Sequence, residues 1–526
     1  MTLASLSDNI KVMKTKFVKN LIKFISRLKN EPSLAFVEKL MRDFSSAEIF
    51  LVGGAVRDAC LGAKDQKDYD FVVRNVNPKH LEKFLRALGS VNFVGKTFGV
   101  NKFRPKGFDE EIDIAYPRTE HAFGTGGYRD VAVNSDPHLA LEKDLSRRDF
   151  TINAVALNWK TGEIIDPFGG LKDLSAKKIR SVGNPAQRIK EDYSRIFRAL
   201  RFACQLNFAI EKKTLLALTK MMAKISQVRA YDGKRERVLP YEVLAKELIK
   251  AFHYNPARAF NLYDKTGAFK VLMPEILPMK KCPQPKEFHS EGDVWKHTRL
   301  CLENLNSARF KKEFGADGKN AEVVIATLLH DIGKPATLKT PKQDGTDRIR
   351  NDGHDMKGAS MAKKICQRLK LDSMPRDSVF RVDIDNVYKI IAGHMFPMSG
   401  KIAKMRPTTI EKRFFNPNFP GENLMKMAFV DAISSLPAKG KPTANLYGAM
   451  KKRIKDLRVA FNAKNRLPKP ILDGREIMAY FKIKPGPKVG KMLEELREAQ
   501  LSGKVKDKNQ ARKYLRTATN SRSHES

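Results

Sequence analysis

Cysteines, acidic residues and long apolar runs are scarce in this chain of 526 residues, and each shortage excludes a class of protein. The five cysteines are odd in number, lie far apart and form no CxxC pair, which argues against a disulfide framework and against a thiolate zinc site. We therefore expect a reducing compartment, the cytoplasm. No apolar run approaches the roughly 20 residues that cross a bilayer, so we expect no membrane segment.

Acidic side chains are outnumbered, because 59 Asp and Glu stand against 99 Lys and Arg, a formal net charge of +40. Charge of one sign on this scale repels itself unless a polyanion screens it, and each basic side chain near a phosphate releases a condensed counterion. A nucleic acid is the expected partner. The alternatives are a merely basic protein and one that adheres to anionic membranes.

Apolar material is present in sufficient amount for several domains. Hydrophobic residues make up 42% of the chain, and its length is typical of roughly three or four domains. In the first part the pattern predicts a helix that begins after a strand, at 55–61, and strands at 48–53, 69–73, 111–115, 150–157 and 163–166. Helical periodicity dominates from about residue 186, as in 192–206 and 241–251.

Proline clusters at 274–285, 437–442 and 468–470 indicate breaks between domains. We predict a basic N-terminal helical extension (1–45), a head (46–160), a helical neck (161–285), a second helical domain (286–440) and a helical, basic tail (441–526). Within these, residues 11–29 predict a solvated helix, with a transit peptide or a membrane-surface helix as alternatives. Residues 502–526 predict a mobile basic segment.

Asp68 and Asp70 flank Tyr69 at the start of a predicted strand. Residues i and i+2 of a strand share a face, so the two carboxylates project together and repel each other unless a cation lies between them. Mg²⁺ binds carboxylate, phosphate and water oxygens, and two such ions can activate a hydroxyl and stabilise a leaving pyrophosphate. Asp113 on another predicted strand is the expected third carboxylate, with Glu111 as the alternative.

Gly53 and Gly54 end the first predicted strand immediately before a helix that carries Arg57. Glycine lets the backbone approach a phosphate closely, and a helix N-terminus favours an anion. A DxD pattern or a glycine pair alone is common in turns and solvated loops. In this order and spacing, the combination predicts a metal-dependent nucleotide site.

Six motifs occur in the order LVGGAVRDACLG, KDYDFVV, IDIAYPRTE, DLSRRDFTINAVAL, DPFGGLKDL and EDYSRIFRALRF. Together they resemble the class II tRNA nucleotidyltransferase and poly(A) polymerase family, over about residues 48–280. Further on, DKTGAFKVLMPEI and GREIMAYFKIKPGPKVGKMLEEL are similar to the same family. The resemblance implies an α/β, polymerase-β-like nucleotidyltransferase head with a mixed sheet, followed by an all-α neck, body and tail.

The resemblance also implies roles for residues of this chain. The catalytic carboxylates of the family, which hold Mg²⁺, fall on Asp68, Asp70 and Asp113. Its arginine-rich motif suits a triphosphate, because the guanidinium fork matches phosphate oxygens. That motif falls on Arg147, Arg148, Asp149 and Asn153, and it joins Gly53, Gly54 and Arg57 as the implied nucleotide site.

The EDxxR motif of the family reads the incoming base without a nucleic-acid template, and its reading pair falls on Asp192 and Arg195. On a helix, positions i and i+3 are neighbours. Asp192 can accept from the exocyclic amine of cytosine or adenine while Arg195 donates to a ring or carbonyl acceptor, whereas the carbonyl of uracil or guanine would be repelled. Arg198 and Arg201 continue this face, with nucleotide contact expected for Arg198, RNA contact for Arg201, and ion pairing as the alternative.

The second helical domain carries histidines and aspartates in the pattern H…HD…D, which resembles the HD phosphohydrolase domain found in some members of the family. Neutral imidazole with carboxylate suits first-row metals. The implied ligands of a divalent transition metal in this HD body are His297, His330, Asp331 and Asp431, with His354 and His394 completing a second position. Such a site would hydrolyse a phosphoester, for example a 2′,3′-cyclic phosphate. The alternative is a vestigial domain that shapes the RNA-binding surface, and His289 is expected at the surface.

The implied function is template-independent addition of CCA to tRNA 3′ ends from CTP and ATP. Alternatives within the family are a poly(A) polymerase and an enzyme that adds only CC or only A. An alternative from another class is an HD phosphohydrolase whose head only binds RNA.

Overall fold

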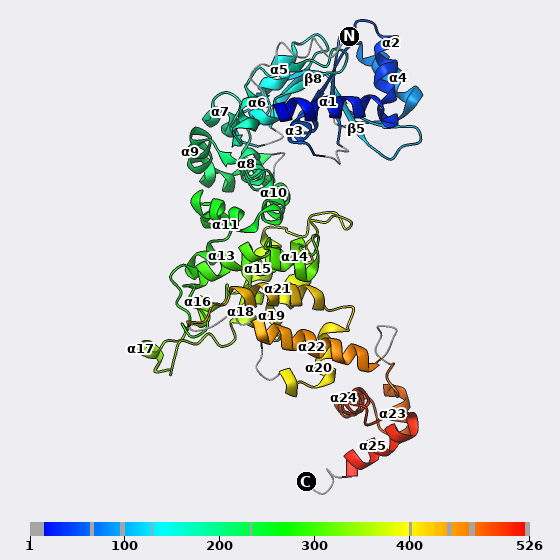
Figure 1. The fold of residues 1–526 in the computed structure, drawn as a ribbon, viewed down its shortest axis with the longest axis vertical. Helices are drawn as coiled ribbons and strands as arrows, with labels where there is room; N and C mark the ends of the chain where they lie inside the picture. Colours follow the sequence, from blue (N-terminus) through cyan, green and yellow to red (C-terminus); the bar gives the residue numbers. More distant parts are fainter. Residues whose placement is uncertain are drawn as a thin grey trace. The chain divides into compact units, whose positions relative to one another are not determined.

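The computed structural model describes residues 15–63, 68–94, 100–127, 130–231, 234–398, 402–438, 444–461 and 469–520. The chain forms two compact units, Met1–Leu272 and Met273–Ser526, whose elements are labelled in Figure 1. The division falls next to the first proline of the predicted break at 274–285. The finer division into five parts remains a prediction.

The first unit is built on a seven-stranded sheet in which β2 and β5 run parallel and the other neighbours run antiparallel. Strand β1, EIFLV, lies inside the sheet with its last four residues buried, as its apolar run predicts. The order is β3 (Gly89–Val94), β4 (Val100–Pro105), β5 (Ile112–Ala115), β2 (Asp70–Arg74), β1 (Glu48–Val52), β8 (Ala156–Asn158) and β9 (Ile164–Ile165). The expected mixed sheet is confirmed, and β9 extends it past residue 160.

Twelve helices accompany this sheet in the described part of the first unit. They are α1 (Thr15–Lys29), α2 (Ala35–Asp43), α3 (Gly54–Leu61), α4 (Pro78–Leu88), α5 (Leu141–Ser146), α6 (Gly170–Ser175), α7 (Pro185–Glu191), α8 (Ser194–Gln205), α9 (Lys212–Met221), α10 (Tyr241–Tyr254), α11 (Pro256–Lys265) and α12 (Ala268–Leu272). The helices predicted at 55–61, 192–206 and 241–251 correspond to α3, α8 and α10.

Three short two-stranded sheets complete the first unit: β6 (Arg118–Ala122) with β7 (Val131–Ser135), β10 (Lys178–Ile179) with β11 (Ala209–Ile210), and β12 (Val228–Tyr231) with β13 (Lys234–Arg237). Two of them lie in the helical neck beyond residue 166, where the sequence predicts no further strand. Residues Thr151–Asn153, predicted as strand, form a 3₁₀ turn, and the strand begins only at Ala156.

Helix α1 packs on the head, so the prediction of a solvated helix is wrong for its described residues. Leu21, Phe24 and Leu28 are buried, and the helix lies against α3 (Figure 1). These three residues recur at i, i+3 and i+7, the spacing of an apolar stripe that faces a core. Residues 11–14 of the predicted helix lie outside the described residues.

The described part of the second unit contains helices and no strand. They are α13 (Val294–Asn304), α14 (Ala308–Phe314), α15 (Ala321–Leu329), α16 (Lys334–Thr337), α17 (Pro341–Asp344), α18 (His354–Arg368), α19 (Ile384–Gly393), α20 (Pro407–Phe414), α21 (Gly421–Ser434), α22 (Ala444–Phe461), α23 (Gly474–Phe481), α24 (Pro487–Leu501) and α25 (Lys508–Asn520). The apolar helix α15 is almost entirely buried, so the polar residues that follow it are delivered to the interior.

Helices α23, α24 and α25 form a C-terminal module with a core of its own, which includes Ile477, Leu496, Ala511 and Leu515. The prediction that residues 502–526 are mobile is therefore wrong for 502–520, since α25 contributes two fully buried side chains. Residues 521–526 lie outside the described part of the chain.

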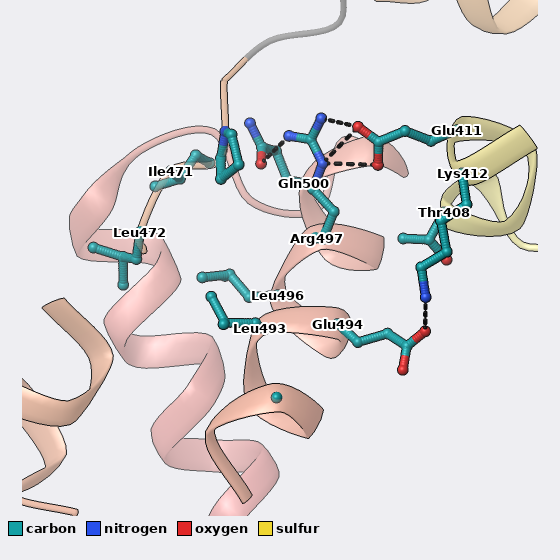
Figure 2. A pocket seen from close by; sticks show the side chains of 12 residues that line it. Thr408, Glu411, Lys412, Ile471, Leu472, Leu493, Glu494, Leu496, Arg497 and Gln500 are labelled. Atoms are coloured by element: carbon teal, nitrogen blue, oxygen red, sulfur yellow. Dashed lines mark hydrogen bonds and ion pairs between the residues drawn. The ribbon is translucent and has the colours of Figure 1, made fainter. Parts of the chain in front are cut away.

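A pocket of about 430 Å³ lies between α20 and α24 (Figure 2). Its polar rim joins the two helices, because Arg497 Nε donates to Glu411 at 2.9 Å and Lys412 Nζ lies 2.7 Å from Glu494. Thr408 Oγ1 also donates to Glu498 at 2.7 Å. The C-terminal module is thus docked on α20 largely through charged and polar contacts.

Candidate active site and candidate metal centre

The predicted catalytic carboxylates gather where β2 and β5 begin. Asp70 opens β2 and is in register with Asp113 of the parallel strand β5. The amide of Asp113 donates to the carbonyl of Tyr69 at 3.1 Å, so pairing of the two segments continues one residue before β2. Asp68 lies just ahead of the strand and is exposed. The DxD pattern and the third carboxylate are therefore brought together at the N-terminal ends of two neighbouring strands.

The carboxylate of Asp70 is electrostatically crowded. Although the residue keeps an exposed surface, partial loss of solvent around its carboxyl group raises its pKa. The charges of Asp113 and Asp68 raise it further, while the guanidinium of Arg148 opposes them. A carboxylate in such surroundings is stabilised by a proton or by a cation. Because Mg²⁺ prefers oxygen ligands, the donor set fits a divalent cation beside Asp70.

Lys102 of β4 distinguishes the two candidates for the third carboxylate. Its Nζ lies 2.5 Å from Glu111 and 3.4 Å from Asp113. The hydrogen bond from Lys102 lowers the pKa of Glu111. Glu111 is thus paired with Lys102, whereas Asp113 lies next to Asp70. This supports Asp113 as the third catalytic carboxylate.

Behind Asp70 lies a cleft of about 400 Å³. Gly53 at its edge has φ +75°, and a Cβ there would lie 2.9 Å from Arg148 Nη1 and 3.7 Å from Asp70 Oδ2. Glycine is required because only it adopts this φ freely and leaves room for both side chains. The predicted residues that line the cleft are Gly53, Gly54, Arg57, Asp70, Arg147, Arg148, Asp149, Asn153, Asp192, Arg195, Arg198 and Arg201.

Hydrogen bonds within the chain hold several of these side chains in place. Arg57 Nη1 donates to Asn153 Oδ1 at 2.7 Å, and Asn153 Nδ2 donates to Asp149 Oδ1 at 3.0 Å. Asp149 Oδ2 in turn accepts from Arg198 Nε at 2.7 Å. Burial opposes ionisation of Asp149, but Arg198 and Asn153 outweigh it and hold the pKa at about 2. The groups in this connected series are thus hydrogen-bonded to one another.

Glu120 and Phe202 line the cleft but were missed by the sequence analysis. Glu120 on β6 accepts from Arg147 Nη1 at 2.7 Å, while Asp144 accepts from Arg147 Nη2 at 2.7 Å. Two carboxylates therefore fix the orientation of the Arg147 guanidinium. Glu120 is the last residue of the motif IDIAYPRTE, but the motif does not indicate that it pairs with Arg147.

The predicted base-reading pair is close together but is not carried by one helix. Asp192 follows α7 in an extended conformation, φ −154° and ψ 106°, and Arg195 lies in the first turn of α8. Asp192 Oδ2 lies 3.9 Å from Arg195 Nε. The expectation of an i, i+3 pair on a helix is wrong, because the chain turns between α7 and α8.

Both members of this pair are held from outside the cleft. The amide of Ser194 donates to Asp192 Oδ1 at 2.8 Å. Arg195 donates to the carbonyls of Arg188 and Arg147 at 2.8 and 3.2 Å. Burial raises the pKa of Asp192, while hydrogen bonds from Ser194 and the charge of Arg195 oppose this effect. A further amine donor would stabilise the ionised carboxylate.

Arg198 and Arg201 are both ion-paired, which was the alternative left open. Arg198 binds Asp149, as above, and Arg201 Nε lies 2.5 Å from Glu247 of α10. Arg201 is 9% exposed, and its guanidinium lies 3.8 Å from the ring centre of Phe202. RNA contact by Arg201 stays a prediction.

Five helices and their ends supply the second cluster. The predicted ligands are His297 on α13, His330 and Asp331 directly after α15, His354 at the start of α18, His394 directly after α19, and Asp431 on α21. All of them are buried. Residues that are scattered over the sequence between 297 and 431 are thus gathered into one cluster.

Asp331 lies between two groups of ligand atoms. Its Oδ2 is 3.3 Å from His330 Nε2 and 3.9 Å from His297 Nε2. Its Oδ1 is 3.6 Å from His354 Nε2 and 3.9 Å from His394 Nε2. Each carboxylate oxygen therefore faces a different histidine pair, which is the arrangement expected of a carboxylate shared by two cation positions.

The hydrogen bonding of these histidines fits a metal. His330, His354 and His394 each direct Nδ1 to a backbone carbonyl, at 2.8, 2.7 and 2.6 Å. Their Nε2 atoms are left for the cluster, and buried His330 Nε2 and Asp331 Oδ1 have no hydrogen-bond partner. Burial lowers the pKa of His394 to about 4, so this imidazole is neutral at pH 7, as a ligand must be. Buried polar atoms without partners are rare, and a divalent cation would satisfy them.

His289 is not at the surface, so that expectation is wrong. Its side chain is 14% exposed, and its Nδ1 lies 2.7 Å from Glu291. The same carboxylate oxygen lies 2.7 Å from His297 Nδ1. Glu291 was missed, because its distance of six residues from His297 follows no regular period and the contact depends on how the loop before α13 folds back.

Two further residues of the centre were missed. Cys301, one helical turn after His297, places Sγ 3.4 Å from its Nε2. Lys334 Nζ lies 2.7 Å from Asp331 Oδ2 and donates to Gln284 at 2.7 Å. A lysine one turn after the HD pair thus brings a buried positive charge to the cluster.

Comparisons with known proteins match the domains that carry the two clusters. Residues 49–180 match the Poly A polymerase head domain family, and residues 294–417 match the HD domain family. Among solved structures, the CCA-adding enzyme of Bacillus stearothermophilus in complex with CTP has a TM-score of 0.59 at 20% identity, over 98% of this chain and 100% of that one. The Thermotoga maritima CCA-adding enzyme complexed with tRNA has a TM-score of 0.56 at 21% identity, over 94% and 98%. These likenesses confirm the expected fold.

Sequence relatives give the family. The multifunctional CCA protein of Shewanella denitrificans is 34% identical over 363 residues, which are 67% of this chain and 78% of that protein. That of Xanthomonas campestris pv. campestris is 36% identical over 329 residues, 62% and 71% of the two chains. No helix of the described residues is both long and apolar enough to cross a membrane. With its head, its HD domain and these relatives, the chain belongs to the multifunctional CCA protein family, the CCA-adding RNA nucleotidyltransferases.

Proposed function

We propose that this chain adds CCA to the 3′ ends of tRNA from CTP and ATP, without a template and in the cytoplasm. The relatives are named multifunctional CCA proteins, and solved structures of the same fold are named CCA-adding enzymes and include complexes with CTP, ATP and tRNA. The observation in this chain that carries the proposal is Asp70, crowded by two other carboxylates at the mouth of an arginine-lined cleft.

Asp68, Asp70 and Asp113 would hold Mg²⁺, which supplies activation of the 3′ hydroxyl and neutralises the leaving pyrophosphate. Gly53 and Gly54 leave space for a phosphate at the start of α3. Arg147 and Arg148, at one side of the cleft, present guanidinium groups to the remaining phosphate oxygens.

Asp192 and Arg195 would select the base. The carboxylate of Asp192 accepts from the amine of cytosine or adenine, and the guanidinium of Arg195 donates to the acceptor beside that amine. Their fixed backbone anchors keep the pair in one orientation. Since a buried polar group left unpaired costs free energy, uracil and guanine are disfavoured.

Extension of a labelled tRNA that lacks CCA tests this proposal. With Mg²⁺, CTP and ATP, we expect ordered addition of C, C and A and then a stop. Asp70→Ala should abolish addition, whereas Asp109→Ala, which removes an exposed carboxylate of the same head, should not. Long A tracts, or C without A, would move the function to a poly(A) polymerase or a partial adding enzyme. Activity retained by Asp70→Ala would refute the proposed site.

A second candidate function, metal-dependent phosphoester hydrolysis by the HD domain, is favoured by the unpaired buried atoms of His330 and Asp331. The cluster opens into a pocket of about 550 Å³ that Lys334, Arg348 and Phe288 help to line. The Phe288 ring is 44% exposed and lies 5.7 Å from the Arg348 guanidinium. Cations suit a phosphate and an exposed ring suits a stacked base, so a nucleotide phosphoester is the favoured substrate.

Metal binding can be tested apart from hydrolysis. A divalent transition metal such as Mn²⁺ or Ni²⁺, added to chelator-treated protein, should raise the melting temperature of the second unit, because it binds the folded state alone. The same metal should not stabilise Asp331→Asn. Asp347→Asn, at an exposed ion pair of the same unit, should behave like the parent protein. Equal stabilisation of Asp331→Asn would exclude this centre.

A further inference from the structure

Helix α1 lies outside the part of the chain that matches the head-domain family, which begins at residue 49. It nevertheless packs on α3, whose residues Gly54 and Arg57 line the cleft, and it interacts with Tyr69, which precedes β2. Leu21, Phe24 and Leu28 supply the apolar contact with the head. An added element that packs on a catalytic segment is suited to support it.

The contact with α3 is close and specific. Asn20 Nδ2 donates to the carbonyl of Cys60 at 3.1 Å, in the last turn of α3. A Cβ on Gly62 would lie 2.8 Å from the same nitrogen, and Gly62 has φ +79°. The end of α3 is therefore shaped to receive α1, while the beginning of α3, at Gly54, borders the nucleotide cleft.

The contact with the catalytic segment is made through Tyr69. In an extended segment successive side chains point to opposite faces, and here Asp68 and Asp70 are exposed while Tyr69 is 5% exposed. The side chain of Tyr69 forms a hydrogen bond with Arg27 of α1. Its carbonyl accepts from the amide of Asp113. Tyr69 is thus held by α1 on one side and by the third carboxylate's strand on the other.

We propose that α1 is a positioning element for the metal-binding carboxylates and acts through Arg27 on Tyr69. The proposal rests on the proposed roles of Asp68 and Asp70. Arg27 touches neither metal nor substrate. It fixes the buried residue between the two carboxylates, and a displacement of those carboxylates by about 1 Å is enough to slow a reaction strongly.

The test compares Arg27→Met, Arg27→Lys and Tyr69→Phe with the parent chain in CTP addition. Loss of the hydrogen bond in Arg27→Met or Tyr69→Phe should lower kcat by about tenfold and raise the Mg²⁺ concentration for half-maximal rate. KM for CTP should stay within about twofold, because no nucleotide contact is removed. Arg27→Lys keeps a donor and should recover most of the rate. The melting temperature of the two Arg27 variants should not change, since Arg27 is exposed.

Arg86→Met is the matched control, because it breaks an exposed ion pair with Glu82 on α4 of the same head. It should leave kcat and Mg²⁺ dependence unchanged. If Asp70→Ala is inactive while Arg27→Met and Tyr69→Phe behave like the parent, α1 only covers the apolar surface of the head and does not position the carboxylates. The proposal then fails. If Asp70→Ala retains activity, the proposed function fails, and this inference with it.

Hydrogen exchange gives a second readout that needs no turnover. Arg27→Met should speed the exchange of amides in β2 and β5, and Arg86→Met should not. Unchanged exchange in both variants would overturn the proposal.

Discussion

Two arginines of the head cleft are paired with carboxylates of the same chain. Glu120 and Asp144 orient Arg147 by hydrogen bonds, and Asp149 orients Arg198 in the same way. Such contacts fix orientation in advance, so that binding does not have to order flexible arginines. Each of these carboxylates also reduces the net positive charge that a triphosphate meets, which favours weak, reversible binding of nucleotides.

Base selection is the property most sensitive to a single residue. Asp192→Ala should lower kcat/KM for CTP and ATP by about 10- to 100-fold, because Arg195 and the base amine each lose their partner. UTP should be affected less, since its carbonyl gains nothing from Asp192. Single-nucleotide incorporation into tRNA that lacks CCA measures both values. An unchanged ratio of CTP to UTP use would show that another group reads the base.

Asp149 makes the stability of the head depend on pH. Its pKa is depressed from 3.8 to about 2, so its ion pair with Arg198 stabilises the fold above pH 3.8 and is lost as pH falls through about 2. Asp149→Asn should therefore be less stable than the parent near neutral pH, and the difference should shrink between these two values. Urea unfolding followed by Trp159 in a Trp295→Phe background reports on the first unit, since the chain has two tryptophans.

At the residue scale, the sequence was informative where chemistry is local. The pair Asp68 and Asp70 and the arginines after residue 146 follow from strand alternation and from motifs. Glu291 was missed because its contact with His297 depends on the fold of a loop. Cys301 and Lys334 lie one turn after His297 and Asp331, so a local signal existed for both and was not used. Asp192 was assigned to a helix because the break between α7 and α8 leaves no proline or glycine in the sequence.

Among the elements, helix and strand ends carry the chemistry. Asp70 opens β2, Gly54 opens α3, and His330, His354 and His394 stand at helix ends. Long periodic segments such as α8 and α10 are predictable from sequence, whereas β10 to β13 have only two to four residues each and leave no periodic signal. Helix α25 was not predicted as an ordered helix, because its sequence has many basic residues and only a few apolar residues at helical spacing.

The contribution of this apolar stripe to the stability of the C-terminal module can be tested. Leu515 is fully buried in the core of the module, so Leu515→Ala should destabilise it by about 2–5 kcal/mol. Limited proteolysis should then cut within α23–α25 more readily. Lys513→Ala, exposed on the same helix, should resist cleavage as the parent does. Equal resistance of Leu515→Ala would mean that α25 contributes nothing to the fold.

For the whole molecule, the net charge of +40 governs association with RNA. If about six phosphates are neutralised in the complex, the Kd for tRNA should rise by about a thousandfold between about 50 and 200 mM salt. Measuring Kd for tRNA and for an unrelated hairpin RNA over this range separates the charge-driven part from recognition of shape. A flat salt dependence would exclude a role for the surplus charge in RNA binding.

The position of Asp331 between two histidine pairs has a consequence for inheritance. A change from an aspartate to an asparagine codon needs only one base substitution, and at residue 331 it would remove a ligand from both cation positions at once. The head, which lies in the other unit of the chain, would keep its carboxylates and its cleft. One mutational step is therefore expected to give a lineage that retains nucleotide addition and lacks the hydrolysis proposed for the HD domain.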